Sequence, residues 1–301
     1  MQIKGDLSMI IKIVSGILVL LTIVFAVIFF QDYMKTKKEG RIEEGGNWVA
    51  YGIIGFIANF FDTLGIGSFA PTTAAYKFFK IVDDRIIPGT LNVANCIPVV
   101  TEALIFITVI KVDITTLVAM IVSATAGSYF GAGIVAKLPE KKIQVGMGAA
   151  LLVVALVMMA GLLKIMPIGG EAIALTGVKL VIGVVGNFII GALMCIGIGS
   201  YAPCMALVFA LGLSPKVAFP IMMGSCAFLE PVAAIKFVKE GAYHRKVSLA
   251  TNLAGVVGVL IAAYIVKELP LNILKWVVVF VIIFTSLIMF RSATKKKIAS
   301  M

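Results

Sequence analysis

Long apolar runs separated by short charged segments make up most of the 301-residue chain. The runs lie at residues 10–30, 47–80, 86–110, 113–136, 141–163, 172–211, 217–238, 247–267 and 270–290. A helix of about 20 apolar residues is long enough to cross the hydrocarbon core of a bilayer. The pattern therefore predicts an all-α polytopic membrane protein that begins with a membrane anchor helix.

Two of the runs contain nearly the same seven-residue stretch, Gly65–Pro71 and Gly197–Pro203, which differ only where Phe69 is replaced by Tyr201. Two alternate glycines followed by serine and proline are a poor helix interior, but serine caps a helix well and proline fits the first turn. Each stretch is therefore expected to break its run into two half-helices, with the serine as N-cap. Broken helices at matching positions of two halves point to the substrate site of a transporter.

The likeness between the two halves extends beyond this stretch. Residues 65–88 align with residues 197–220 without a gap, and Gly127 aligns with Gly258 at nearly the same spacing. Such self-similarity predicts an internal duplication. The predicted division is an anchor helix and loop at 1–46, repeats at 47–164 and 171–291, each with one broken or re-entrant helix plus three transmembrane helices, and a basic cytoplasmic tail at 292–301.

Small residues recur at every fourth position in the third segment of each repeat. They are Ser123, Gly127 and Gly131 in the first repeat, and Ala254, Gly258 and Ala262 in the second. Small residues at this spacing allow two helices to approach closely in lipid. We interpret them as a packing signal.

The distribution of Lys and Arg favours one topology. If both broken segments cross the membrane, the loops carry roughly 14 basic residues on one side and about 10 on the other. If each enters and leaves on the same face, the division becomes about 18 to 6, the asymmetry that the positive-inside rule expects. We therefore predict seven spans, two hairpins opening from opposite faces, inverted repeats, an external N-terminus and a cytoplasmic C-terminus. Residues 172–196, however, are long enough to cross alone.

Composition excludes several other classes of protein. The net charge of +11 comes from basic clusters between apolar runs, which topology explains better than nucleic-acid binding. The four cysteines show no CxxC spacing, so no metal site or disulfide framework is expected. His244 is the only histidine, and a nucleophile paired with a base is not found in any run, so an enzyme and a cofactor are not expected.

The duplicated Gly-x-Gly stretch followed by proline, with the apolar segments after it, resembles the TauE/SafE family of sulfite and organosulfonate transporters. The likeness covers about residues 48–290 and leaves the N-terminal helix outside. Ser68 and Ser200 stand where that family usually has a third glycine. The resemblance implies a secondary transporter in the cell membrane for sulfite or short organosulfonates such as sulfoacetate, with proton coupling.

The residues themselves also favour an anionic substrate. The runs contain hardly any Lys or Arg away from their ends, so the N–H groups at the half-helix N-termini are expected to hold the anion. The candidate binding residues at the breaks are Gly65, Gly67, Ser68, Thr72, Gly197, Gly199 and Ser200. The alternative is that the two stretches merely kink structural helices.

Polar residues in the helices after the breaks are further candidates. Asn92, Asn95 and Glu102 lie within about 80° of one another on a helical wheel, and Ser225 and Glu230 occupy the comparable region of the second half. An ionisable group in a span is a functional candidate, so Glu102 and Glu230 are proton-coupling candidates, with structural hydrogen bonding as the alternative. Asn92, Asn95 and Ser225 are expected to contact the substrate, with interhelical bonding as the alternative for the asparagines.

Other interpretations of the same residues remain open. Asp62 precedes the first break, where Met194 is its counterpart, and it either tunes the site or caps the loop. Carboxylates near broken helices also suit a cation-coupled carrier or an ion channel. The expected partners are a small anion and membrane lipid, without nucleic acid, and a homodimer is left open.

Overall fold

The computed structural model describes residues 2–106, 112–166, 169–265 and 271–294, which are helical throughout apart from short connections. The helices are α1 (Gln2–Lys38), α2 (Trp48–Thr63), α3 (Phe69–Phe78), α4 (Ile87–Phe106), α5 (Ile114–Val135), α6 (Glu140–Leu162), α7 (Gly177–Met194), α8 (Tyr201–Ala210), α9 (Pro215–Lys239), α10 (Arg245–Ile265) and α11 (Leu271–Thr294), with a 3-10 turn at Asp84–Ile86. The all-α prediction is confirmed for these residues.

Local sequence sets several helix boundaries. Asn47 caps α2 by accepting hydrogen bonds from the backbone N–H groups of Val49 and Ala50, and Asp113 caps α5 through the N–H of Thr116 at 2.9 Å. Pro215 is the first residue of α9, where its missing N–H has no intrahelical role. These caps lie between apolar runs, so the segmentation follows from the sequence.

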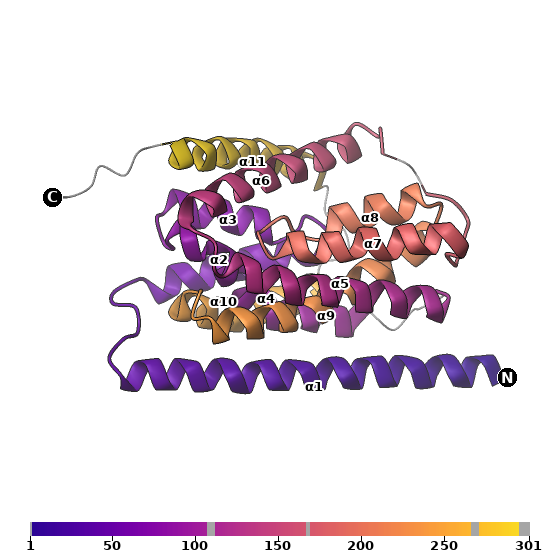
Figure 1. Ribbon diagram of the computed structural model, residues 1–301, viewed down its shortest axis with the longest axis horizontal. Helices are drawn as coiled ribbons and strands as arrows, with labels where there is room; N and C mark the ends of the chain where they lie inside the picture. Colours follow the sequence, from indigo (N-terminus) through magenta and orange to yellow (C-terminus); the bar gives the residue numbers. More distant parts are fainter. Residues whose placement is uncertain (1, 107–111, 167–168, 266–270, 295–301) are drawn as a thin grey trace.

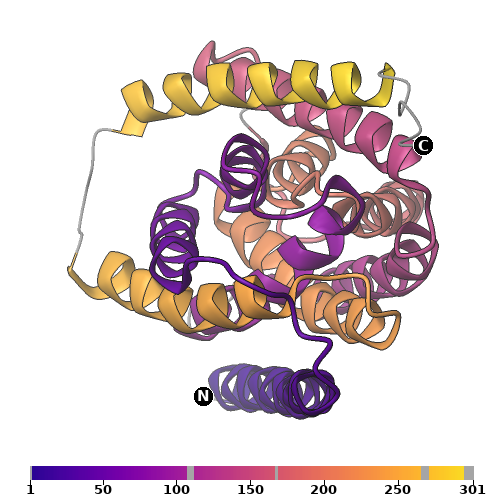
Figure 2. The same cartoon turned by 90° about the vertical axis from the view of Figure 1, so that its left-hand side faces the viewer.

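Eight helices in the described ranges are long and apolar enough to cross a membrane: α1, α4, α5, α6, α7, α9, α10 and α11. Many of them expose large apolar side chains, such as Leu20 of α1 and Phe280 of α11, as lipid-facing helices do. Figure 2 shows α1 and α11 at opposite edges of the bundle. The chain is therefore a multi-pass membrane protein.

The broken segments form two helical hairpins, α2 with α3 and α7 with α8, which lie towards opposite ends of the bundle (Figure 1). In the second hairpin, Lys179 near the start of α7 donates to the carbonyl of Leu211 after α8 at 3.1 Å, so both outer ends meet. Ser200 at the tip contacts Cys226 in the middle of α9. The hairpin therefore turns back halfway along the bundle, although α7 alone satisfies the length of a span.

The two halves of the chain are interlocked. Helix α2 packs on α10 and α7 packs on α5, while α4 packs against α9 at the centre and α6 against α11. At Gly127 an added Cβ would lie 2.0 Å from the carbonyl oxygen of Phe188, and at Gly258 it would lie 2.4 Å from that of Phe56. The glycines thus hold α5 against α7 and α10 against α2, as the small-residue pattern predicted.

The packing is equivalent in the two halves, because each hairpin packs against a helix from the other half. The duplication, the inverted orientation and the boundaries at 1–46, 47–164, 171–291 and 292–301 stay predictions from the sequence. Residues 295–301 of the predicted basic tail lie outside the described residues.

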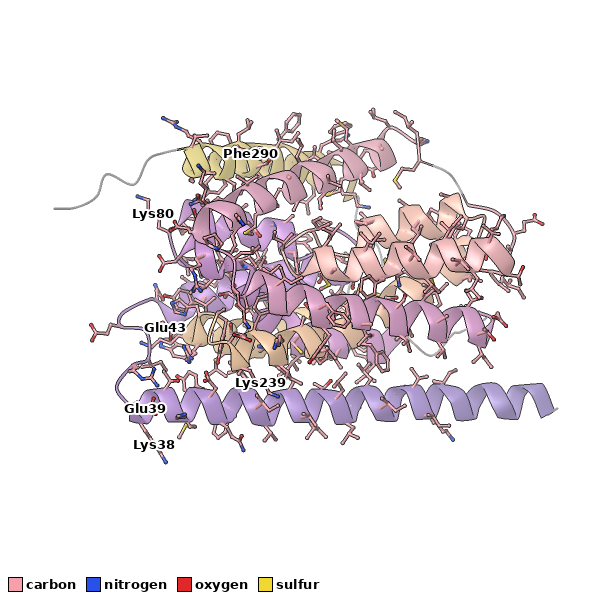
Figure 3. The ribbon with its side chains drawn as sticks, viewed as in Figure 1. Lys38, Glu39, Glu43, Lys80, Lys239 and Phe290 are labelled. Carbon is pink, nitrogen blue, oxygen red and sulfur yellow. The ribbon has the colours of Figure 1, made fainter. Side chains whose placement is uncertain are left out.

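Polar side chains join the connections at one end of the bundle, which we call the polar end. Arg245 donates to Asp32 at 2.8 Å and lies 3.7 Å from Glu43, which links the end of α1 to the start of α10. Lys77 pairs with Asp84, and Gln144 donates to the same carboxylate at 2.7 Å. Figure 3 shows Lys38, Glu39, Glu43 and Lys80 at this end. Basic residues from several connections, such as Arg245, Lys77 and Lys80, thus lie at one end of the bundle.

Candidate functional site

The two breaks have the same backbone geometry. Gly65 and Gly67 have φ values of 85° and 90°, and Gly197 and Gly199 have values of 104° and 71°, a region that side chains disfavour. The N–H of Gly65 donates to the carbonyl of Asp62 at 2.7 Å, and the N–H of Gly197 donates to that of Met194 at 2.9 Å. The predicted breaks are confirmed, and glycine is what permits them.

The serines occupy the N-cap positions but do not act as caps. Ser68 precedes α3 and Ser200 precedes α8, and neither side chain makes a capping hydrogen bond. The expected capping is therefore wrong, because both serines have αR backbone conformations and their hydroxyls point to other groups. Pro71 and Pro203 are each the third residue of their half-helix, within the first turn as predicted.

A cavity of about 650 Å³ lies where the two breaks meet. Gly65, Gly67 and Ser68 line it from the first break, and Gly199 and Ser200 line it from the second. Most of the remaining wall is apolar and comes from α6, α8 and α9. Two breaks that are far apart in the sequence thus share one chamber, which is the arrangement expected of a small-ligand site.

The side chains around the two serines differ. The Asp62 carboxylate interacts with the hydroxyl and the backbone N–H of Ser68. The Ser200 hydroxyl lies 2.8 Å from Cys226 Sγ and 3.4 Å from Met194 Sδ. The first break therefore presents a carboxylate, and the second presents uncharged sulfur groups.

Three buried carboxyl groups surround this region. Asp62 and Glu230 line the cavity, and Glu102 accepts a hydrogen bond at 2.8 Å from the hydroxyl of Tyr201, which also lines it. Glu230 is 0% exposed, and neither of its oxygens has a partner within the described structure. Buried carboxyls without a cation are costly when ionised, so this cluster is suited to holding protons.

The asparagine and serine candidates after the breaks lie outside the cavity wall. Asn95 accepts a hydrogen bond from Asn59 of α2 at 3.0 Å, and Ser225 accepts one from Asn187 of α7 at 3.0 Å. Asn92 donates to the carbonyl of Pro88 in its own helix at 2.9 Å. In the structure Asn95 links α4 to α2, and Ser225 links α9 to α7. These contacts correspond to the alternative of interhelical hydrogen bonding.

Two further predicted residues do not line the cavity either. Thr72 is buried in α3, and its hydroxyl has no partner within the described structure. Gly197 is packed near Met147 and Leu91. Gly65, Gly67, Ser68, Gly199, Ser200 and Glu230 are thus the predicted residues that the structure gathers at the cavity.

Several residues of the site were not among the predicted ones. Tyr201 and Cys226 line the cavity beside Ser200, and Lys164 and Lys275 line it from the C-terminal end of α6 and the first turn of α11. Tyr201 lies inside the repeated stretch, at the one position where the two copies differ, and that difference is the signal that could have singled it out. The lysines lie at the ends of apolar runs, where positive charge usually marks topology. Nothing in the nearby sequence distinguishes them from the other lysines at such ends.

Asn252 is a further polar group that sequence reasoning missed. Its side chain accepts from the N–H of Ile97 at 3.0 Å and donates to the carbonyl of Val93 at 2.7 Å. It therefore bridges α10 to the backbone of α4, next to Pro98. Asn252 holds in place the helix that carries Glu102.

No group of three His, Cys, Asp or Glu side chains among the described residues is arranged to hold a metal ion. The four cysteines are free and buried. Cys226 is the one that lines the cavity. The chemistry available at the cavity therefore comprises hydrogen bonding, helix N-termini, two lysine side chains and proton exchange at carboxyl groups.

Comparison with known proteins identifies a family. The family model described as "Sulfite exporter TauE/SafE" matches residues 4–158 and 179–300. This match includes α1, so the expectation that the N-terminal helix lies outside the likeness is wrong. No curated protein and no solved structure matches the chain.

Proposed function

Since the chain belongs to the sulfite exporter TauE/SafE family and is a membrane transporter, we propose that it moves sulfite or a short organosulfonate across the cytoplasmic membrane. The observation that supports this substrate class is the cavity between the two breaks, where the first N–H groups of α3 and α8 begin. Helix N-termini bind compact oxyanions through backbone donors without burying a cation. The apolar remainder of the wall has room for a short organic tail.

We further propose that transport is coupled to protons. Three buried carboxyl groups lie around the cavity, and an anion entering beside them is repelled unless protons neutralise them. Glu102 and Glu230 are the proposed proton carriers. The predicted orientation, with the polar end in the cytoplasm, follows from its basic residues.

Proteoliposomes test the substrate directly. Purified protein should accumulate labelled sulfite when a pH gradient is imposed, and a two-carbon sulfonate should compete better than chloride or acetate. If Glu230 or Glu102 carries the proton, its glutamine variant should still exchange sulfite across the membrane but should not accumulate it, because an amide cannot take up a proton. Chloride competing as well as sulfite would refute the oxyanion assignment.

A cation-coupled carrier or channel remains the second candidate, and the same three carboxyl groups favour it. Carboxylates that bind Na⁺ would make sulfite uptake follow a sodium gradient at constant pH. Accumulation driven by sodium alone would replace the proton-coupled proposal.

A further inference from the structure

The two breaks carry chemically different side chains at the same position. Asp62 lies six residues before Ser68, and Met194 lies six residues before Ser200. Asp62 interacts with the hydroxyl and backbone N–H of its serine, and Met194 places its Sδ 3.4 Å from the hydroxyl of its own. One position thus supplies a negative group to the first break and an uncharged group to the second.

This difference decides where an incoming anion can bind. A helix N-terminus favours a negative charge, and at α3 the chain supplies that charge through Asp62. A second anion placed there would be repelled by the carboxylate. At α8, Glu102 accepts a hydrogen bond from the Tyr201 hydroxyl and Asp62 also acts on that side chain, but within the described structure no carboxylate is hydrogen-bonded to Ser200 or to the backbone N–H groups that begin the helix. The backbone donors at the N-terminus of α8 therefore have no carboxylate partner of their own.

A second, independent feature points to a ligand at the same place. Glu230 lies one turn after Cys226 in α9 and lines the cavity with it. It is 0% exposed, and both oxygens lack a hydrogen-bond partner among the described residues. A carboxyl group left without partners in a cavity wall is satisfied when a ligand binds beside it. In its acid form it donates a hydrogen bond to an oxyanion.

We propose that the two breaks are not equivalent: the chain's own Asp62 occupies the N-terminus of α3, and the substrate anion binds at the N-terminus of α8, between Ser200 and the acid form of Glu230. The assignment rests on the proposed function only in taking the substrate to be a small oxyanion. Under this assignment only one of the two half-helix N-termini at the cavity binds the substrate anion, so each chain has one anion site.

The charged and titratable groups that face Glu230 agree with an acid form. They are Asp62, Glu102, Cys96, Cys195 and Cys226. None of these groups is cationic in any protonation state. Lys164 and Lys275 also line the cavity, but they are not among the groups that face Glu230. The groups that do face Glu230 therefore favour its acid form.

Exchanging the side chains at the two breaks tests the assignment. With purified full-length protein in lipid nanodiscs and sulfite as the probe, Met194→Asp should weaken binding about 100-fold or more at pH 7.5, because it places a carboxylate beside the proposed site. Met194→Asn is the matched control, which has nearly the same size and no charge, and it should bind within about threefold of the wild type. Asp62→Asn should bind sulfite at least as tightly as the wild type, since it removes a negative group from the cavity without altering the donors at α8.

The outcomes separate this assignment from the proposed function. Wild-type affinity in Met194→Asp, or loss of binding in Asp62→Asn with retained folding, would overturn the assignment and leave the sulfite function intact. Failure of the wild type to bind sulfite would count against the function itself. If Met194→Asp does not fold, a pair of carboxyl variants decides: Glu230→Gln should flatten the pH dependence of sulfite affinity, and Glu171→Gln, at an exposed residue that does not line the cavity, should preserve it. The reverse result would overturn the role of Glu230.

Discussion

Replacing Gly199 with leucine should block the site while leaving the protein folded. Gly199 has a φ of 71°, so any other L-residue there is strained by about 1–2 kcal/mol. An added Cβ would meet only the Cβ of Phe69, at 3.8 Å, which is ordinary contact. Since Gly199 lines the cavity, the rest of the side chain projects into space that a ligand needs. We expect a stability loss of about 1–2 kcal/mol and a loss of sulfite binding of at least about tenfold.

Gly40 provides a matched control for the backbone strain. Its φ is 66°, an added Cβ meets nothing within 4 Å, and it lies in the loop after α1, away from the cavity. Gly40→Leu should therefore lose no more stability than Gly199→Leu and should bind sulfite normally. Thermal unfolding and sulfite titration in the same detergent measure both quantities. Normal binding in Gly199→Leu, or equal loss in both variants, would refute the reasoning.

Three further predictions follow from the packing and the polar end. Ser68→Ala should lower the unfolding free energy by about 1–3 kcal/mol, because Asp62 loses its buried donor. Ser200→Ala should lower it less, because the hydroxyl of Ser200 contacts only sulfur groups. Equal losses of the two variants in chemical denaturation would contradict this difference between the breaks. Gly127→Ala should cost about 1–3 kcal/mol by forcing α5 from α7. Gly16→Ala in α1, which meets nothing within 4 Å, is the control in thermal unfolding and should lose no stability, because alanine favours a helix interior more than glycine does. Burial lowers the pKa of His244, so stability should fall as pH decreases from about 6.5 towards its folded pKa, and a thermal scan of His244→Asn should show a smaller fall.

The sign of the histidine effect follows from proton counting. Below about pH 6.5 the unfolded chain binds a proton at His244 that the folded chain resists, so lowering the pH favours unfolding. Above that pH both states are neutral at this residue, and the effect vanishes. Glu43 and Asp83 act against the lowering of the His244 pKa by burial, and Lys246 adds to it. A stability maximum below pH 6 that disappears in His244→Asn would contradict this account.

The structure also shows hydrogen-bond partners that the sequence left ambiguous. An asparagine in a span can donate to a substrate, to another helix or to its own backbone, and the helical wheel does not distinguish these partners. In the structure Asn92 bonds to Pro88, and Asn95 bonds to Asn59. The serines occupy N-cap positions without capping, because Asp62 and Cys226 are nearer partners for their hydroxyls.

The sequence by itself determined the helical segments and both breaks, because hydropathy, glycine and proline act through the local backbone. Gly65 and Gly199 adopt positive φ values wherever their helices lie, and a run of about 20 apolar residues is helical in lipid for want of other hydrogen-bond partners. The small residues around Gly127 and Gly258 predicted close helix packing, but they did not indicate which helix packs against them.

Only the tertiary structure decided which side chains share the cavity. Asp62, Glu102 and Glu230 belong to three helices, and their proximity depends on how deeply each hairpin enters the bundle and how each helix is rotated. Depth and rotation are fixed by contacts between distant residues, such as Gly127 against Phe188, which no local pattern encodes. The sequence already shows Asp62 opposite Met194, but only the structure places each of these side chains beside its serine, so that two breaks with the same backbone present different chemistry to one ligand.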